Sequence, residues 1–368
     1  MPQDIPLISG RPRIHLGGQQ RQDLESGLLR LEIAEHLGRP SACRIRVTNW
    51  GSGRGGRPGY EHFDSEGPWF GEELLVQVSY RDALLNIFSG RIVGLEGIYP
   101  DNRPPELEIH AEDALETLRR FTRSREFRNM TDGQIAGSIA GEYGLSPLVE
   151  LEGGTHDTVV QLQQDDLSFL VERVRIAGGD VRVRDGQLLA LPRGKSDVPT
   201  VPLEFGAELA AFRATADLAG QVSSLRVHAW DGLNKQPAVG PASAGSAADM
   251  PGFADGGAVL QSTLGPGEWQ GARSGAGDAN AAEMLARTYY RERSGRFLRG
   301  SGSGPGLPQV WAGRRVLIGG LGDWFDGEYQ VRRVLHFYDQ DNGYRTDMET
   351  ERPSWRVKRL RRRLNDHR

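Results

Sequence analysis

The sequence is almost free of cysteine, with Cys43 the only one in 368 residues. A single cysteine excludes an intrachain disulfide framework and any metal site built from several cysteines. The chain also lacks the run of ~18 apolar residues that a membrane-spanning helix needs, and its mean hydropathy is −0.50. Its start, MPQDIPLISGRPR, lacks the apolar stretch of a secretory signal. We therefore expect no membrane insertion by this chain and a location in the cytoplasm.

Acidic residues outnumber basic ones over most of the chain. The sequence has 45 Lys and Arg against 49 Asp and Glu, a net charge of −4. The last 16 residues, PSWRVKRLRRRLNDHR, carry +6, so the remaining 352 carry −10. Nucleic-acid binders need a basic surface to meet phosphates. The acidic body therefore predicts no nucleic-acid binding.

Patterns that carry chemistry are weak or missing. The eight histidines show no zinc-ligand spacing, and no G-x-S-x-G nucleophile elbow occurs. Gly51-x-Gly53-x-x-Gly56 resembles a dinucleotide fingerprint in letters alone, because Arg57-Pro58 follows it instead of a helix. Cys43 and His110 lie in strand patterns, which favours packed side chains. We predict no catalytic residues, no metal ligands and no cofactor, although no pattern excludes a glycosidase carboxylate pair.

Short strands dominate the first third of the chain. Residues 28–49 are predicted to form two strands with a break at Gly38-Arg39-Pro40, because apolar residues alternate with polar ones on both sides of it, and 74–80, 84–97 and 107–111 continue the pattern. Such closely spaced strands predict a β-barrel or sandwich domain over 1–112. Residues 51–59 (GSGRGGRPG) predict a loop between them.

Helix signals begin near Asp113 and define a small α+β domain over 113–199. Asp113 is placed to cap a short helix, and Thr131-x-x-Gln134 is a capping-box pattern. Asp165 or Asp166 caps a second expected helix, which Gly178-Gly179 ends. Asp185-Gly186 then predicts a tight two-strand hairpin.

Strands return over 200–352, which predicts a second β-barrel domain. Residues 236–277 are rich in Gly, Ala, Ser and Pro and predict a long loop, and Asp278 begins a helix over 278–294. Strands at 314–320, 327–339 and 343–351 close the domain. The fold class is thus mainly β with an α+β insert. The strands at 28–49 and 314–351 end at open edges unless they are paired, and exposed edges invite partners.

Two surface features are candidates for partner binding. Trp50, Tyr60, Phe63, Trp69 and Phe70 gather around the first glycine-rich loop, where they either pack the loop or face a partner. Residues 353–368 form a basic tail that is either solvated or a docking arm. In the second case Trp355, Val357, Leu360 and Leu364 share one helical face. The cations of this arm are Arg356, Lys358, Arg359, Arg361, Arg362 and Arg363.

Four stretches taken in order resemble a known family. They are IFSGRIVGLEG with LEIHAEDALETLRR (87–120), MTDGQIAGSIAGEYGLSP (130–147), LQQDDLSFLVERVRIAGGDVRVRDGQLLALP (162–192), and 203–236 with 312–352. The order resembles the phage late control D, or tail-hub, family, which also forms the hub portion of VgrG spike proteins. The resemblance covers roughly 20–352.

The resemblance implies a structural protein with two β-barrels and a small α/β unit between them. It implies a homotrimer whose six barrels join a sixfold inner tube to a threefold spike. The implied partners are the tube protein, a separate spike protein and other baseplate components. The particle, a phage tail or tail-like injection machine, would assemble in the bacterial cytoplasm. Two alternatives remain: a stand-alone module that binds carbohydrate or a protein partner, and an enzyme that degrades cell walls.

Overall fold

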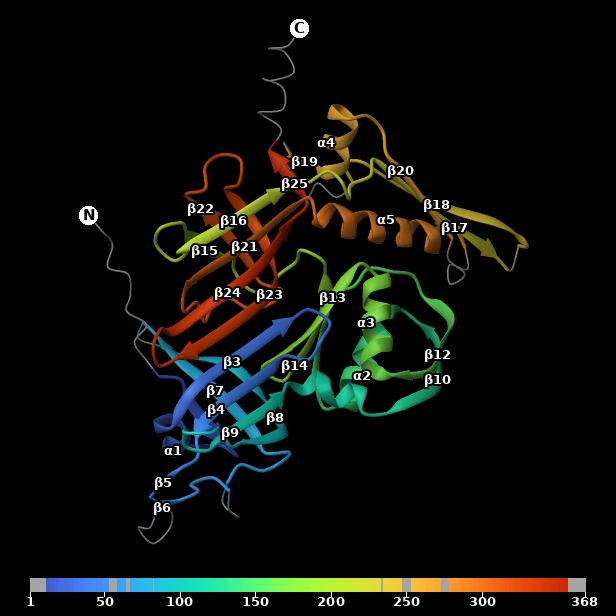
Figure 1. Ribbon diagram of the computed structural model, residues 1–368. Coiled ribbons are helices and arrows are strands. Elements are labelled where there is room, and N and C mark those ends of the chain that lie inside the picture. Colours follow the sequence, from blue (N-terminus) through green and yellow to red (C-terminus); the bar gives the residue numbers. More distant parts are fainter. Residues whose placement is uncertain are drawn as a thin grey trace.

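The computed structural model describes residues 11–52, 58–63, 67–81, 83–232, 234–246, 253–272 and 278–356. Strands dominate these residues (Figure 1), and the mainly-β class with a small α+β insert is confirmed. None of the described helices combines the length and apolarity needed to cross a lipid bilayer.

The first half of the molecule is a curved sheet at the lower left of Figure 1. Its strands pair in the order β3, β4, β9, β8, β7, β1, β2. Alternate residues of these strands fill one core, in which Cys43 is buried. The elements are β1 (Arg13–Leu16), β2 (Gln19–Gln20), α1 (Gln22–Ser26), β3 (Leu28–His36), β4 (Ala42–Thr48), β5 (Gly51–Ser52), β6 (Pro58–Gly59), β7 (Glu73–Tyr80), β8 (Ala83–Ile98) and β9 (Glu106–Glu112).

The second half continues the same sheet at the upper left of Figure 1. Its pairing order is β16, β21, β24, β23, with β22 and the parallel strand β15 at its side. The elements are β15 (Val201–Glu204), β16 (Ala211–Ala216), β21 (Leu298–Pro305), β22 (Arg315–Gly319), β23 (Gly327–Asp339), β24 (Gly343–Arg352) and β25 (Ser354–Arg356). The Asn342-Gly343 turn joins β23 to β24 as predicted, with Gly343 at φ 67°.

Strand β23 joins the two halves. Its first part pairs with β22 and its last seven residues pair with β3, from Arg333↔His36 to Asp339↔Arg30. The strands at 28–49 and 314–351 are therefore paired with one another through β3 and β23, and no open edge remains between them. Among the described strands of this sheet the free edges lie at β16, β15 and β2. Both halves share this sheet, in which β22 and β15 branch off at β23, and no closed barrel is found among the described strands.

The insert lies between the two halves in sequence and at the lower right of Figure 1. The Thr131–Gln134 capping box forms on α2, and Asp165 caps α3 as predicted. Asp185-Gly186 makes the turn between β13 and β14, with both residues at positive φ. The elements are η1 (Ala114–Arg119), β10 (Thr122–Met130), α2 (Asp132–Glu142), β11 (Ser146–Val149), β12 (His156–Asp165), α3 (Asp166–Ile176), β13 (Gly179–Arg184) and β14 (Gln187–Pro192).

Most of the predicted loop over 236–277 is regular structure, so that expectation is wrong. Strands β18 and β20 flank β17 in a small sheet that packs on α5, and together with α4 they form the upper layer in Figure 1. A Cβ at Gly240 would lie 2.0 Å from the backbone of Ala282, so glycine permits close packing of β18 on α5. The elements are β17 (Ser224–Asp231), β18 (Gln236–Ser243), β19 (Phe253–Asp255), α4 (Gly256–Thr263), β20 (Glu268–Ala272) and α5 (Ala279–Gly295).

Candidate functional site

Strands β5 and β6 lie at the lower end of the first half in Figure 1, and exposed aromatic side chains, among them Trp50 and Tyr60, flank these strands in the sequence. Tyr60 contacts Trp50 at 5.5 Å, Phe63 at 5.4 Å and Tyr99 at 6.4 Å between ring centroids. The side chains touch one another yet remain open to solvent, from 37% for Phe63 to 64% for Tyr99. We call these four residues the aromatic cluster. Trp69 and Phe70 form a second exposed pair, 5.5 Å apart.

A buried side chain binds the backbone that carries part of the aromatic cluster. Asn49 is fully buried, and its side-chain oxygen accepts hydrogen bonds from the backbone N–H groups of Glu61 and His62 at 3.1 and 2.8 Å. A Cβ at Gly97 would lie 3.1 Å from Phe63 and Tyr99, so this glycine leaves room for both rings. The five aromatic residues picked from the sequence are thus all exposed. Tyr99 was missed because it enters from β8, far along the chain.

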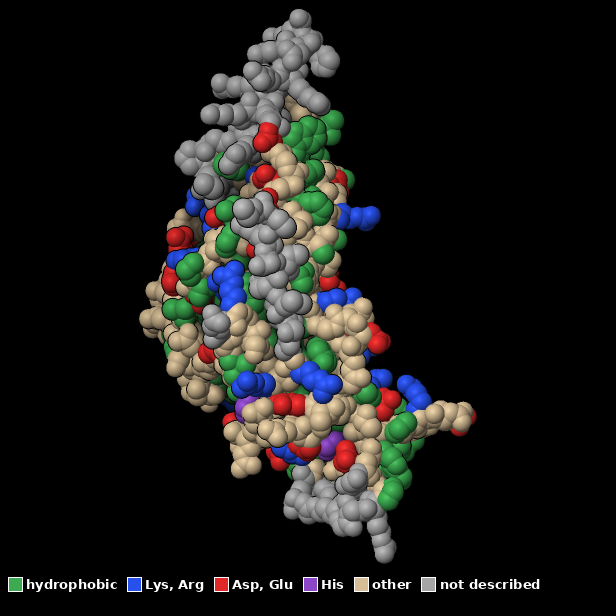
Figure 2. Space-filling model, turned by 90° about the vertical axis from the view of Figure 1, so that its left-hand side faces the viewer, with side chains coloured by type: hydrophobic (Ala, Val, Ile, Leu, Met, Phe, Trp, Pro, Cys, Tyr) green, Lys and Arg blue, Asp and Glu red, His purple; other side chains and the backbone are tan. Residues whose placement is uncertain are grey.

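Figure 2 shows Lys and Arg interspersed with Asp and Glu on the face that lies at the left in Figure 1. The aromatic cluster differs from such a mixed surface because its large exposed rings contact one another. Interface cores are enriched in such residues, so the aromatic cluster is a candidate protein-binding surface.

One group of side chains has the composition of a metal site. Glu96, Glu108 and His110 bring their ligand atoms within 4.8 Å of one another. Glu108, however, already accepts from the Arg46 guanidinium at 2.6 Å. A cation beside that guanidinium would meet like charge, so the group fits an ion pair on the sheet better than a metal centre. The absence of metal ligands stays a prediction.

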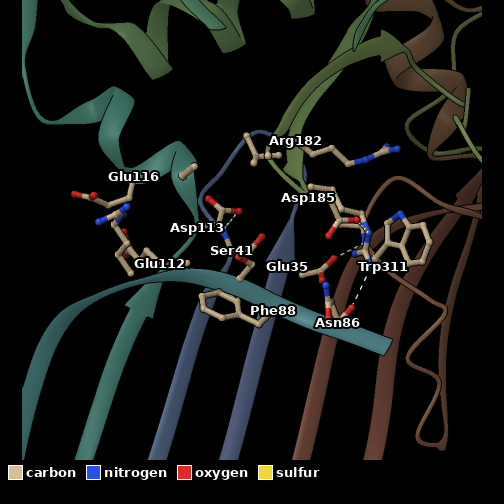
Figure 3. A pocket seen from close by; sticks show the side chains of 18 of the residues that line it. Glu35, Ser41, Asn86, Phe88, Glu112, Asp113, Glu116, Arg182, Asp185 and Trp311 are labelled. Carbon is tan, nitrogen blue, oxygen red and sulfur yellow. Dashed lines mark hydrogen bonds and ion pairs between the residues drawn. The ribbon is translucent and has the colours of Figure 1, made fainter. Parts of the chain in front are cut away.

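A cavity of about 370 Å³ separates the first half from the insert, and we call its surroundings the carboxyl joint (Figure 3). Glu35 accepts from the Ala312 N–H at 2.9 Å, and Asp113 accepts from the N–H groups of Ser41 and Leu115. Desolvation raises the pKa of both carboxyl groups to about 6. Burial likewise lowers the pKa of Arg182, which lines the same cavity.

The side chains of the carboxyl joint are held in place by hydrogen bonds and by contacts between arginines and an aromatic ring. Both carboxyl groups are engaged by backbone donors, and the Trp311 ring is held between Arg184 at 3.8 Å and Arg314 at 4.0 Å. His36 lines the cavity too, but its Nδ1 bonds the Leu37 carbonyl. These contacts link the β13–β14 hairpin to both halves of the sheet, so the geometry favours a structural role over chemistry.

Ion pairs join the insert to the second half, and we call them the ion-pair joint. Arg193 meets Glu351 at 2.7 Å, and Arg332 meets Asp180 at 2.5 Å and Glu351 at 3.6 Å. Arg332 is the extra residue at a register shift in β23, between Val331 and Arg333. Such a bulge re-aims a side chain, and here it directs Arg332 toward the insert.

The predicted docking tail is only partly described. Trp355 lies in β25, which pairs with β19, so this residue belongs to a strand and not to the expected helical face. Its ring packs against Phe297, Trp324 and Phe325 at 5.7–6.0 Å. Arg356 ends the same strand. The other cations of the proposed arm, Lys358, Arg359, Arg361, Arg362 and Arg363, lie outside the described residues.

Solved structures place this fold among phage tail proteins. A 43 kDa tail protein of prophage MuSo2 from Shewanella oneidensis is 16% identical, with a TM-score of 0.66 over 93% of this chain and 98% of that one. A tail protein from Neisseria meningitidis MC58 is 12% identical, with a TM-score of 0.66 over 93% and 96%. An Escherichia coli component of the type VI secretion system, described as similar to the T4 tail proteins gp27 and gp5, is 14% identical, with a TM-score of 0.57 over 88% and 73%.

These likenesses fit the resemblance to the tail-hub family in its broad form. No curated protein matches the sequence. One family model does, and it matches residues 13–339. That span takes in the first half of the sheet, the insert, the upper layer and the second half as far as the end of β23. The chain therefore belongs to the family described as the Alg8 N-terminal domain.

Proposed function

We propose that the chain is a structural hub in the baseplate of a contractile injection machine, either a phage tail or a tail-derived particle. The observation that carries this proposal is the shared fold, which extends over 93% of this chain and 98% of a prophage tail protein. A likeness that spans both proteins leaves little of either chain for an unrelated function. The same comparison supports a structural, non-catalytic role.

The hub is a homotrimer that adapts a sixfold inner tube to a threefold spike, as expected of the late control D family. Each chain contributes two curved sheet halves, joined by β23. Three chains therefore present six similar units, which matches a sixfold partner, and closed rotational symmetry is the usual solution for such contacts. The partners are a tube protein, a separate spike protein and other baseplate components, and assembly takes place in the bacterial cytoplasm.

The aromatic cluster supplies a surface for one of these contacts. It is exposed, and the buried Asn49 side chain accepts hydrogen bonds from the backbone between Tyr60 and Phe63. Rigid aromatic anchors dominate the binding energy of many interfaces. The basic tail from Arg356 onward remains a second proposed docking element, either to a neighbouring hub subunit or to a baseplate or spike protein.

Native mass spectrometry of the full chain, alone and with its tube protein, tests the assembly. A chain of 40.5 kDa gives a trimer of about 120 kDa. The double variant Trp50→Ser/Tyr99→Ser should lose the trimer or the tube complex. Trp230→Ser is the matched control, because Trp230 is an equally exposed aromatic on the upper layer.

The outcomes separate cleanly. The hub proposal is overturned if the wild-type chain stays monomeric and does not bind the tube protein. A double variant that assembles like the wild type leaves the hub in place and removes the aromatic cluster from its interfaces. Release of reducing sugar from peptidoglycan by the purified chain, abolished by one carboxylate-to-amide change, would contradict the non-catalytic role.

A further inference from the structure

A cleft rich in arginine runs between the insert, the second half and helix α5. Its cavity has a volume of about 660 Å³. Six arginines and four carboxylates line it. They are Arg175, Arg193, Arg213, Arg296, Arg299 and Arg332, with Asp180, Glu292, Glu349 and Glu351. We call this feature the arginine cleft.

All four carboxylates of the arginine cleft are already engaged. Asp180 and Glu351 belong to the ion-pair joint. Glu292 accepts two hydrogen bonds from Arg175, at 2.5 and 2.7 Å. Glu349 pairs with Arg333, which lies outside this cavity, at 3.2 Å. No carboxylate of the cleft remains to neutralise its other cations.

Arg213 and Arg296 are the cations left over. Among the described residues no carboxylate pairs with either one, and Arg299 has only a 3.5 Å contact with exposed Asp217. Arg296 is at the C-cap of α5, where the helix dipole favours a cation. No helix end accounts for the cation at Arg213, which lies in a strand opposite Ser301. A body with a charge of −10 thus concentrates unpaired positive charge in one cleft.

The arginine cleft is continuous with a free sheet edge. Arg213 and Thr215 belong to β16, which pairs with β21 alone among the described strands. A second hollow of about 550 Å³ shares Arg213, Ser301 and Glu349 and extends the cleft along the strands toward Ala211. An exposed edge offers backbone donors and acceptors to an added strand.

We propose that the arginine cleft binds an extended acidic segment of another protein, which adds to the edge of β16 and sets its carboxylates against Arg213 and Arg296. Guanidinium groups match carboxylates with paired hydrogen bonds. Strand addition supplies main-chain hydrogen bonds, and alternate side chains of the added strand face the arginines. The inference stands apart from the hub proposal, because the cleft lies within one chain.

The length of the cleft favours a polypeptide over a small phosphate. Unpaired cations come from β16 and from the end of α5, and the hollow continues along the strand direction. One extended chain can reach both cations and the edge together. A compact anion has no peptide backbone to form strand-like hydrogen bonds with the edge of β16.

The test uses a labelled peptide of roughly eight residues with Glu at every second position and Thr or Val between. The full-length chain should bind it, and Arg213→Gln/Arg296→Gln should weaken binding about tenfold. Arg226→Gln, an exposed arginine on β17, is the matched control and should bind like the wild type. Raising salt to ~0.5 M should weaken binding to the wild type more than to the double variant.

Two peptides methylated on alternate backbone nitrogens test strand addition, because only one of them blocks the bonded edge. Loss of binding by one and retention by the other supports the proposal. Equal binding by both overturns strand addition. Tripolyphosphate that binds in place of the peptide, with loss on Arg213→Gln/Arg296→Gln, overturns the polypeptide class. Failure of both probes overturns the cleft as a site, provided that thermal unfolding shows the chain folded.

Discussion

The insert meets the sheet through two joints of opposite character. At the carboxyl joint, Glu35 and Asp113 are engaged by backbone N–H groups and desolvated. At the ion-pair joint, Asp180 and Glu351 are neutralised by Arg332 and Arg193. Burial at the first joint disfavours the charged form of its two carboxyl groups, whereas the carboxylates at the second joint are paired with arginines. The two joints should therefore respond to different perturbations.

The largest effect is expected at the ion-pair joint. Glu351→Ala removes the carboxylate that pairs with Arg193 and leaves Asp180 as the one carboxylate paired with Arg332 among the described residues. Removing one member of a buried pair costs roughly 3 kcal/mol, because the remaining charge stays desolvated. Urea denaturation should show a loss of that order in the free energy of unfolding. Glu349→Ala, two residues along β24 and exposed, should lose less than about 1 kcal/mol. Equal losses for the two variants would contradict the contrast.

The carboxyl joint should respond to pH in the opposite sense to a paired carboxylate. The pKa of Glu35 is raised from 4.5 to about 6, so the folded state holds the proton more tightly than the unfolded state. Its contribution to the free energy of unfolding therefore grows as pH falls from about 7 to 4.5. Glu35→Gln keeps an acceptor for the Ala312 N–H and removes the charge. This variant should be about 1–2 kcal/mol more stable at pH 7.

Denaturation of the Glu35→Gln variant across pH 5–7 gives the measurement for this joint. Its stability should rise less than that of the wild type as the pH falls. Glu32→Gln, on the same strand, is the control and should follow the wild-type profile. A Glu35→Gln profile that runs parallel to the wild type would remove Glu35 as the source.

The smallest effect is expected where α3 meets α5. Arg175 and Glu292 form an ion pair across these helices, and the Arg175 side chain is 55% exposed. Exposed pairs contribute about 0–1 kcal/mol and are screened by salt. Glu292→Gln should cost no more than that at low salt and almost nothing at ~1 M salt. A loss that persists at high salt would place this pair with the ion-pair joint.

Local signals in the sequence predicted local structure well. The Thr131 capping box, the Asp165 and Asp278 caps and the Asp185-Gly186 turn depend on residues within a few positions of one another. The pairing of β3 with β23 depends on partners about 300 residues apart. No periodicity in either strand specifies that partner. The sequence therefore left open whether these strands would be paired.

The loop prediction for 236–277 failed for a different reason. Glycine and proline were taken as breakers, whereas Gly240 fits β18 against α5 and Pro237 and Pro241 lie on an edge strand. For the surfaces, the aromatic residues near one loop were found by proximity in sequence. The joints and the arginine cleft combine residues from three regions of the chain, and no motif links them.

The β3–β23 pairing also sets the order in which the molecule can be completed. During synthesis β3 emerges early, but its second neighbour is made only when the ribosome reaches residues 327–339. The core of the first half likewise takes in Tyr338 and Tyr344 from the far end of the chain. Until then β3 presents an unpaired strand edge beside an unfinished core, a state prone to aggregation. Folding of the first half is thus tied to the synthesis of residues 327–339, and contacts of such high sequence separation make it slow.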